Sequence, residues 1–532
     1  MPTLEWIGKD KVINHHQEVP FRVLERRYSY DEAGQHDEDN GSENMIIRGD
    51  NLEALKALLP RYEGRVKCIY IDPPYNTGNE GWVYNDNVND PRIKKWLGEV
   101  VGKEGEDLTR HDKWLCMMYP RLKLLQRLLA EDGVIFISID DNAQTLLRMI
   151  CDEIFGARNF LAQMVWQKRT SPDARRKVST GHEYICAYFK NIYMADNSIN
   201  LLSFSEEDKR KYKNPDNDPR GPWVSTDCTA QAGHGTKDQF YKMVTPSGRI
   251  IELPDSLCWR FTKTRMDEEI AAGRIWFGTD GKGVPRKKTY LSERDGRNIW
   301  TWWPNTEVGH TQEATKEITA IFGKTATFDY PKPVRLIQRI IQIATAKDSI
   351  ILDSFAGSGT TAHAVLNMNK ADGGNRKFIL VEMMDYADSI TAERVRRVIR
   401  GYGEGKNAVE GTGGSFSYYE LGPVLLLPDG NLNEEVGPQK IREYVYYMET
   451  KEPLPAEQPK DEPYFMGLCR NTAYYFYYER ESVTTLDYAF LATIQTKAEG
   501  YTIYADLCAI PQETLRKHNI TFKKIPRDIA RL

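Results

Sequence analysis

The sequence VKCIYIDPPYNTG occupies residues 66–78 and decides our prediction of the fold. Its first half is apolar, β-branched and aromatic, which predicts a short buried strand. The strand stops at Asp72, because Pro73 and Pro74 cannot donate hydrogen bonds to a neighbouring strand. In an open α/β sheet, ligands bind outside the carboxyl ends of the strands. We therefore expect Asp72 and Tyr75 to stand on a stiff loop, where an acceptor and a flat ring can grip an amino group on a planar heterocycle.

A second stretch, IILDSFAGSGTT at residues 350–361, is again an apolar strand that runs into a Gly-rich turn and then a helix. A Gly-rich turn alone is a weak signal, because many cofactors bind to one. Together, however, the Asp-Pro-Pro-Tyr loop and this turn resemble two motifs of the amino-group DNA methyltransferases. Their order, with the catalytic motif before the cofactor motif, resembles the β-group of these enzymes.

The resemblance implies an α/β fold, a doubly wound Rossmann-like methyltransferase sheet with an inserted target-recognition domain and a small C-terminal α+β domain. The last part resembles the carboxyl-terminal part of modification (Mod) subunits of type III restriction-modification systems. We expect an N-terminal arm at 1–44, the catalytic half at 45–190, the target-recognition domain at 191–322, the S-adenosylmethionine-binding half at 323–400, a linker at 401–414 and the C-terminal domain at 415–532.

The catalytic residues that the resemblance implies are Asp72, Pro73, Pro74 and Tyr75. In this interpretation the Asp72 carboxylate and the Pro73 carbonyl accept the two N–H bonds of the target amine, and Tyr75 stacks on the base. The base must leave the duplex to reach them. Asp before Pro-Pro-Tyr favours the N6 amino group of adenine as a family tendency, and N4 of cytosine stays open as the alternative.

The resemblance also implies a site for S-adenosylmethionine. Glu382 ends the strand after the Gly-rich turn, where a carboxylate can accept hydrogen bonds from ribose hydroxyls. Lys332 precedes a helix within Pro-Lys-Pro and can meet the methionyl carboxylate; an incidental lysine at a proline helix start is the alternative. For Asp50, an ordinary helix cap is equally compatible. The candidate cofactor residues are Asp50, Lys332, Pro333, Asp353, Phe355, Gly357, Ser358, Gly359 and Glu382.

Candidate DNA contacts lie in the second half of the catalytic region. A tight basic cluster there suggests phosphate contacts, although solvated loop charges are the alternative for any one of its members. Residues 76–106 are rich in Asn, Gly and Asp and predict a long loop beside the site, suited to a lid or a DNA contact. The candidate DNA-binding residues are Lys168, Arg169, Arg175, Arg176, Lys177 and His182.

Composition bounds these expectations. The 532 residues carry a net charge of only −4, so a DNA-binding surface must be a local patch. Eight cysteines without a CxxC pair indicate a reducing compartment and no zinc site, and we expect no metal. No apolar run approaches the ~20 residues that a membrane span needs. We expect a soluble, cytoplasmic protein that associates with the nucleoid of a prokaryote.

Two function classes remain beside the enzyme. The chain can act chiefly as a DNA-recognition subunit for a partner restriction (Res) helicase-nuclease, as in type III systems. It contains no Walker loop or nuclease motif of its own, so cleavage would need that partner. A catalytically dead regulator is disfavoured, because both motifs are intact. The resemblance also implies a homodimer on double-stranded DNA with a flipped target base.

Overall fold

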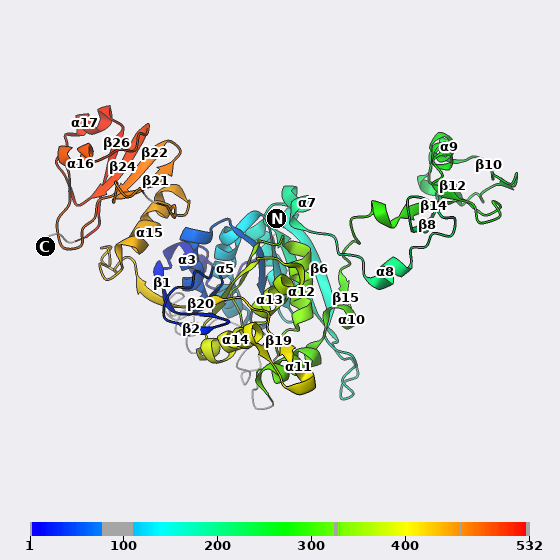
Figure 1. Cartoon of the computed structure of the whole chain (residues 1–532), viewed down its shortest axis with the longest axis horizontal. Coiled ribbons are helices and arrows are strands. Elements are labelled where there is room, and N and C mark those ends of the chain that lie inside the picture. Colours follow the sequence, from blue (N-terminus) through cyan, green and yellow to red (C-terminus); the bar gives the residue numbers. More distant parts are fainter. Residues whose placement is uncertain (1–2, 77–109, 324–327, 329, 458, 528–532) are drawn as a thin grey trace. The chain divides into compact units, whose positions relative to one another are not determined.

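The computed structural model describes residues 3–76, 110–323, 328, 330–457 and 459–527 (Figure 1). The loop that we predicted at 76–106 falls, apart from Asn76, outside these residues. The chain forms two compact units, one made of Met1–Asn200 with Trp300–Leu532 and the other of Leu201–Ile299. Within the described residues, no helix is long and apolar enough to cross a membrane.

The first unit contains a mixed sheet of eleven strands in the described part of the chain. In spatial order they are β15 (Trp302–Trp303), β6 (Phe160–Gln167), β7 (His182–Phe189), β5 (Leu129–Ile139), β4 (Val66–Ile71), β16 (Ile350–Asp353), β17 (Lys377–Glu382), β3 (Met45–Arg48), β20 (Phe416–Val424), β1 (Arg22–Asp31) and β2 (Gly34–His36). The six strands from β5 to β20 run parallel. The predicted α/β sheet is therefore present, with β4 and β16 as direct neighbours.

Helices cover the parallel strands. On one face, α3 (Asn51–Tyr62) and α5 (Arg110–Leu128) bury apolar side chains such as Leu55 against Ile69 and Ile137. The interiors of β4, β16 and β17 are largely apolar and buried, which is the pattern of strands covered by helices on both faces. Every residue of β4 from Cys68 to Ile71 is at most 2% exposed.

A second group of helices also contacts these strands. Helix α12 (Val334–Ala344) contacts β4, and α13 (Thr360–Asp372) contacts α12 and β17. Ile337 and Ile341, one helical turn apart, are fully buried. Helix α14 (Glu393–Arg400) packs against α13 and completes this layer.

The N-terminal segment differs from the arm that we expected at 1–44. Strand β1 pairs with β20 in the main sheet, and Trp6, Val12 and Val19 belong to its hydrophobic core. The strand was missed because its sequence, RVLERRYSYD, is highly charged, and its burial depends on pairing with a strand almost 400 residues away. Polar composition alone does not reveal such a partner.

Two further boundaries differ. Strand β20 lies within the expected C-terminal domain but pairs with β3 and β1, so the main sheet extends to Val424. The expected linker at 401–414 forms the short hairpin of β18 (Gly401–Tyr402) and β19 (Val409–Glu410). Beyond it, α15 (Pro438–Thr450) precedes a four-stranded sheet in the order β21 (Phe465–Cys469), β22 (Thr472–Phe476), β24 (Gly500–Ala505) and β26 (Ile520–Lys524).

The second unit lies inside the expected recognition domain but is shorter, because the residues from Trp300 onward belong to the first unit. Its three-stranded sheet has the order β13 (Ile275–Trp276), β14 (Arg286–Tyr290) and β8 (Trp223–Asp227). Trp223 and Trp259 are buried within the second unit.

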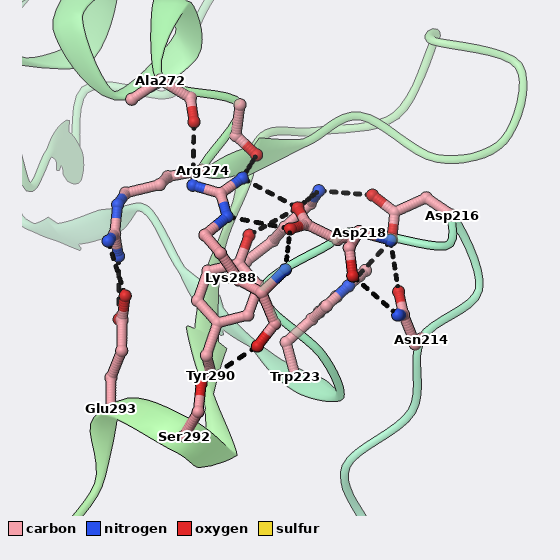
Figure 2. Close-up of polar contacts among 12 residues, drawn as sticks. Asn214, Asp216, Asp218, Trp223, Ala272, Arg274, Lys288, Tyr290, Ser292 and Glu293 are labelled. Atoms are coloured by element: carbon pink, nitrogen blue, oxygen red, sulfur yellow. Dashed lines mark hydrogen bonds and ion pairs between the residues drawn. The ribbon is translucent and has the colours of Figure 1, made fainter.

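A charged cluster ties this sheet together. Figure 2 shows Asp218 beside Lys288 and Tyr290. Asp218 accepts hydrogen bonds from the Lys288 ammonium at 2.9 Å and from the Tyr290 hydroxyl at 2.7 Å. Arg220 donates two further hydrogen bonds to it, from Nε and Nη2. Since Lys288 is only 5% exposed, these contacts compensate a buried charge.

Candidate active site

Two neighbouring strand ends form the centre of the site. Strands β4 and β16 pair in parallel, with Leu352 opposite Ile69. Parallel strands bring their carboxyl ends to the same edge of a sheet. Asp72, directly after β4, and Asp353, the last residue of β16, therefore stand at one edge, and the charge of Asp72 acts on Asp353. The structure thus places the two sequence motifs side by side.

Both carboxylate oxygens of Asp72 are engaged. Its Oδ2 lies 2.5 Å from Lys332 Nζ, and its Oδ1 accepts a hydrogen bond from the Tyr75 hydroxyl at 2.7 Å. The same hydroxyl lies 3.1 Å from Glu183 Oε2. Lys168 in turn donates to Glu183 Oε1 at 2.7 Å. Two carboxylates and two ammonium groups therefore form one continuous network around the ring of Tyr75.

The loop between Asp72 and Asn76 is held by a hydrogen bond from helix α5. The indole nitrogen of Trp114, on α5, donates to the carbonyl oxygen of Pro74 at 2.6 Å. Pro73, Pro74 and Tyr75 are all buried. The proline rings restrict the backbone of the loop, and the hydrogen bond from Trp114 fixes the carbonyl oxygen of Pro74. The loop therefore holds Asp72 on a rigid backbone.

Burial dominates the electrostatics of this network. Burial raises the pKa of the Asp72 carboxyl, and the Lys332 ammonium opposes that rise without cancelling it. For Glu183, burial also acts to raise the pKa, but Lys332 and Lys168 outweigh it and hold that pKa below its ordinary value. Burial would lower the pKa of Lys332, but Asp72 and Glu183 hold it above the ordinary value. The site therefore stabilises Lys332 in its charged form.

The Gly-rich turn is organised by two carboxylates. Asp353 accepts hydrogen bonds from the Phe355 backbone N–H at 3.0 Å and from the Thr361 hydroxyl at 2.6 Å. Glu382, at the end of β17, accepts from the Gly357 backbone N–H at 2.8 Å. Gly359 has φ +81°, and a Cβ there would lie 3.0 Å from a backbone oxygen. Only glycine fits this close approach without strain.

A buried arginine supports the same turn. Arg394, on α14, is fully buried and donates to the hydroxyls of Ser358 and Thr360, each at 2.9 Å. Its Nη2 lies 3.2 Å from His363 Nδ1. Burial lowers the pKa of Arg394 to about 10. The Thr360 hydroxyl also donates to the carbonyl oxygen of Lys332 at 3.3 Å, so Arg394 connects the turn with the Pro-Lys-Pro segment.

Asp50 has the helix-cap role that we left open. Its Oδ1 accepts from the Leu52 backbone N–H at 2.8 Å at the start of α3, and its Oδ2 pairs with Arg121 at 3.3 Å. The neighbouring Asn51 donates from its side chain to the Ser354 carbonyl at 3.2 Å. The α3 N-terminus is thereby joined to the end of β16.

Two cavities share Lys332 in their lining. The smaller spans about 290 Å³, open solvent at its mouth included, and is lined by Asp72, Asp353, Phe355 and Ser358 with other residues of both motifs. The larger contains about 1020 Å³, including its open mouth. It is lined by residues from β6, β7 and the loop between them, Glu183 among them, and by the start of α11 (Thr311–Phe322). Lys332 lines both cavities.

The candidate DNA-binding residues have different surroundings. Arg169, Arg176 and Lys177 are exposed on the loop between β6 and β7. Arg175 is exposed too and pairs with Asp173 of the same loop at 3.0 Å. Lys168, by contrast, is directed at Glu183. The ring nitrogen Nε2 of His182 lies 3.1 Å from the Tyr184 hydroxyl.

Two residues of the site were missed from the sequence. Glu183 stands in an otherwise largely apolar strand, HEYICAYF, where a buried carboxylate is itself a signal of a paired charge. Arg394 is buried on α14, a helix with four arginines in eight residues, and nothing in that run of charges singles it out. Neither role follows without the fold, because their partners come from distant elements.

Comparison with known proteins identifies the family. Residues 66–393 match the N6_N4_Mtase family, described as DNA methylase. This chain belongs to the DNA methylase family. The matched range contains every predicted catalytic residue, and of the predicted cofactor residues it omits only Asp50.

Three named proteins are similar in sequence to this chain. The type III restriction-modification enzyme StyLTI Mod subunit of Salmonella typhimurium is 34% identical over 421 residues, covering 74% of this chain and 62% of that protein. The EcoPI Mod subunit of Escherichia phage P1 is 33% identical, covering 71% and 63%. The type II methyltransferase M.KpnI of Klebsiella pneumoniae is 32% identical, covering 65% and 81%. The chain thus spans less than two thirds of the length of these two Mod subunits.

Proposed function

We propose that this chain is a site-specific DNA methyltransferase that transfers a methyl group from S-adenosylmethionine to the exocyclic N6 amino group of adenine. The observation that carries the proposal is the position of Asp72 and its proline loop beside the Gly-rich turn, at one edge of the sheet. The names of the relatives support the reaction class, because they are methyltransferases and Mod subunits.

The residues of the smaller cavity fit the proposed methyl donor. Phe355 offers an aromatic ring, and Asp72 and Asp353 place carboxylates around the same space, which suits a sulfonium cation. The Ser358 hydroxyl and the Lys332 ammonium suit a carboxylate. S-adenosylmethionine, when bound, supplies an electrophilic methyl group.

The chain's own residues would bind and orient the amine. The Asp72 carboxylate and the Pro73 carbonyl accept its two N–H bonds, which directs the nitrogen lone pair toward the smaller cavity. Tyr75 stacks on the base. The base leaves the duplex to reach this buried loop, and the larger cavity offers the way in. Acceleration then comes mainly from positioning two reactants in one geometry.

The exposed basic loop supports contact with the DNA backbone. Arg169 lines the larger cavity, and Arg176 and Lys177 follow another lining residue, Arg175, on the same loop. All are exposed. Basic side chains at such a position neutralise phosphates around an extruded nucleotide. Lys168, in the wall of the larger cavity, and His182, at the start of β7, would then add further contacts. We further propose that the second unit recognises the target sequence.

Methyl transfer to DNA tests the proposal. Wild type and Asp72→Ala are incubated with tritiated S-adenosylmethionine and unmethylated genomic DNA, and the nucleosides are separated after digestion. We expect N6-methyladenine with wild type and a loss of about 100-fold or more with Asp72→Ala. Equal incorporation by both proteins would exclude the site. N4-methylcytosine as the product would keep the site and change the target base.

The Mod-type role is the second candidate, favoured by the relatives of type III systems. In it the chain is a homodimer that recognises DNA for a Res helicase-nuclease. A helicase-nuclease gene beside the gene of this chain would support it, and a solitary methyltransferase gene would count against it. Light scattering of the purified protein measures the oligomeric state directly.

A further inference from the structure

The place that the target amine needs is filled in this structure. Lys332 Nζ lies 2.5 Å from Asp72 Oδ2, and it also lies 5.1 Å from the centre of the Tyr75 ring. The Tyr75 hydroxyl takes the other oxygen of Asp72 at 2.7 Å. A base that stacks on Tyr75 and donates to Asp72 must therefore displace the ammonium group of Lys332.

Such a displacement is costly unless another carboxylate receives the ammonium. Lys332 is 7% exposed, and a buried charge that loses its partner destabilises a protein strongly. Water cannot reach such a group freely enough to replace the lost carboxylate. The network must therefore contain a second acceptor for Lys332.

Glu183 is that acceptor by distance and geometry. Its Oε2 lies 3.8 Å from Lys332 Nζ, so a small side-chain movement brings the two into contact. Lys168 occupies Oε1 at 2.7 Å and leaves Oε2 available to Lys332 and Tyr75. Glu183 is itself 8% exposed and held by β7. It is thus a fixed anion beside a movable cation.

The cavities agree with this arrangement. Lys332 lines both of them, Asp72 lines the smaller and Glu183 lines the larger. The side chain whose ammonium holds Asp72 is therefore part of the wall of both cavities. For the amine and the methyl donor to come together, this group has to leave Asp72.

We propose that Glu183 is a positioning residue for methyl transfer, which receives the ammonium of Lys332 when the target amine replaces that ammonium on Asp72. The inference rests on the proposed function, because it concerns the same reaction. Glu183 touches neither the amine nor the methyl donor in this account. It determines how readily the Lys332 ammonium leaves Asp72, so that the Asp72 carboxylate can accept from the amine.

Glu183→Gln isolates the charge from the shape. A glutamine keeps the size of the side chain and an oxygen that accepts from Tyr75 or Lys168, but it lacks the negative charge that would compensate the ammonium of Lys332. We expect the single-turnover rate constant, measured with enzyme in excess on unmethylated genomic DNA, to fall by about tenfold or more. The dissociation constant for the same DNA, measured by fluorescence anisotropy, should stay within roughly twofold, because phosphate contacts dominate it.

Glu63→Gln is the matched control. Glu63 is a partly buried carboxylate in the same unit that pairs with Arg127 at 2.7 Å and contacts the Tyr447 hydroxyl. It follows α3, at the end of β4 opposite to the site. Loss of this charge pair should leave the rate constant within roughly twofold of wild type. A comparable fall in both variants would indicate a general structural effect and would overturn the inference.

The double variant Lys332→Met with Glu183→Gln tests the connection between the two residues. If Glu183 acts through Lys332, Glu183→Gln should add little to the loss that Lys332→Met already causes. A full multiplication of the two losses contradicts this connection, as does a Glu183→Gln rate within about threefold of wild type. If wild type itself transfers no methyl group, the proposed function fails. If wild type and Glu183→Gln transfer equally well, only the inference about Glu183 fails.

Discussion

The Lys332 ammonium lies 2.5 Å from the Asp72 carboxylate across 260 residues of sequence. The two side chains are 7% and 12% exposed, so the ion pair is shielded from solvent and salt. It joins the loop after β4 to the segment before α12. The two halves of the site, which the second unit separates in the sequence, are thereby fixed to one another.

Lys332→Met should shift the pH dependence of methyl transfer. Burial raises the pKa of Asp72 and the Lys332 ammonium opposes the rise, so removal of that ammonium raises the pKa further. Asp72 accepts hydrogen bonds in its ionised form, and activity falls as the pH drops through its pKa. The acid limb of the kcat/KM profile, which reports groups of the free enzyme, should therefore move to higher pH by about one unit or more. An acid limb at the wild-type position would contradict this account of Asp72.

Asp353→Asn should change how stability depends on pH. Burial raises the pKa of Asp353 from 3.8 to about 7. Its proton stabilises the folded state fully below pH 4, and this contribution is lost as the pH rises from about 4 to 7, because the unfolded chain releases the proton first. The loss amounts to about 4 kcal/mol. Asparagine cannot ionise, so the variant lacks this loss.

Urea denaturation of both proteins between pH 4 and pH 8 measures the effect. The free energy of unfolding of Asp353→Asn, relative to wild type, should increase up to about pH 7 and then level off. A difference that stays constant over this range would show that Asp353 ionises in the folded protein as it does in the unfolded chain.

The two motifs were predictable because each is local. The strand and the proline loop at residues 66–78 contain their own stop, and Gly359 marks the turn before α13. Adjacency of the two strands followed only from the resemblance, and the structure shows it as the pairing of β4 with β16. Local periodicity and turn chemistry are sufficient for this much.

The electrostatic network was not predictable in the same way. Glu183, Lys168 and Lys332 come from different elements, and each charge is meaningful only through its partner. Lys168, which we predicted as a DNA contact, also donates to Glu183, a partner that the sequence does not reveal. Strand β1 was missed for a related reason, since a charged strand becomes half-buried only when β20 is beside it. Long-range pairing decides such positions.

Arg394→Met should weaken cofactor binding. Three hydrogen-bond partners of the guanidinium, Ser358, Thr360 and His363, belong to the Gly-rich turn and the start of α13. Loss of bonds from a charged donor costs about 1.5–3 kcal/mol, so the dissociation constant for S-adenosylmethionine should rise about tenfold or more. Isothermal titration calorimetry with the purified protein measures it.

Arg397→Met is the matched control for Arg394. Arg397 lies one turn further along α14, is 37% exposed and pairs with Glu393 at 2.7 Å. Its loss should leave the affinity for S-adenosylmethionine within roughly twofold, because exposed ion pairs contribute little. Equal weakening by both variants would show that helix stability, and not the contacts of Arg394, sets the affinity.

Asp218→Ala should unfold the second unit while sparing the first. Asp218 is buried and accepts from Lys288, Tyr290 and Arg220, so its removal leaves the Lys288 charge with fewer partners in a small core. Breaking a buried pair costs about 3–5 kcal/mol. Hydrogen exchange should therefore accelerate throughout Leu201–Ile299 and remain unchanged in α12 and α13. Affinity for S-adenosylmethionine should stay near the wild-type value while sequence-specific methylation is lost.

Asp227→Ala, which removes an exposed pair with Arg286, should cost no more than about 1 kcal/mol. If Asp218→Ala exchanged as slowly as wild type, the cluster in Figure 2 would not be what stabilises this unit.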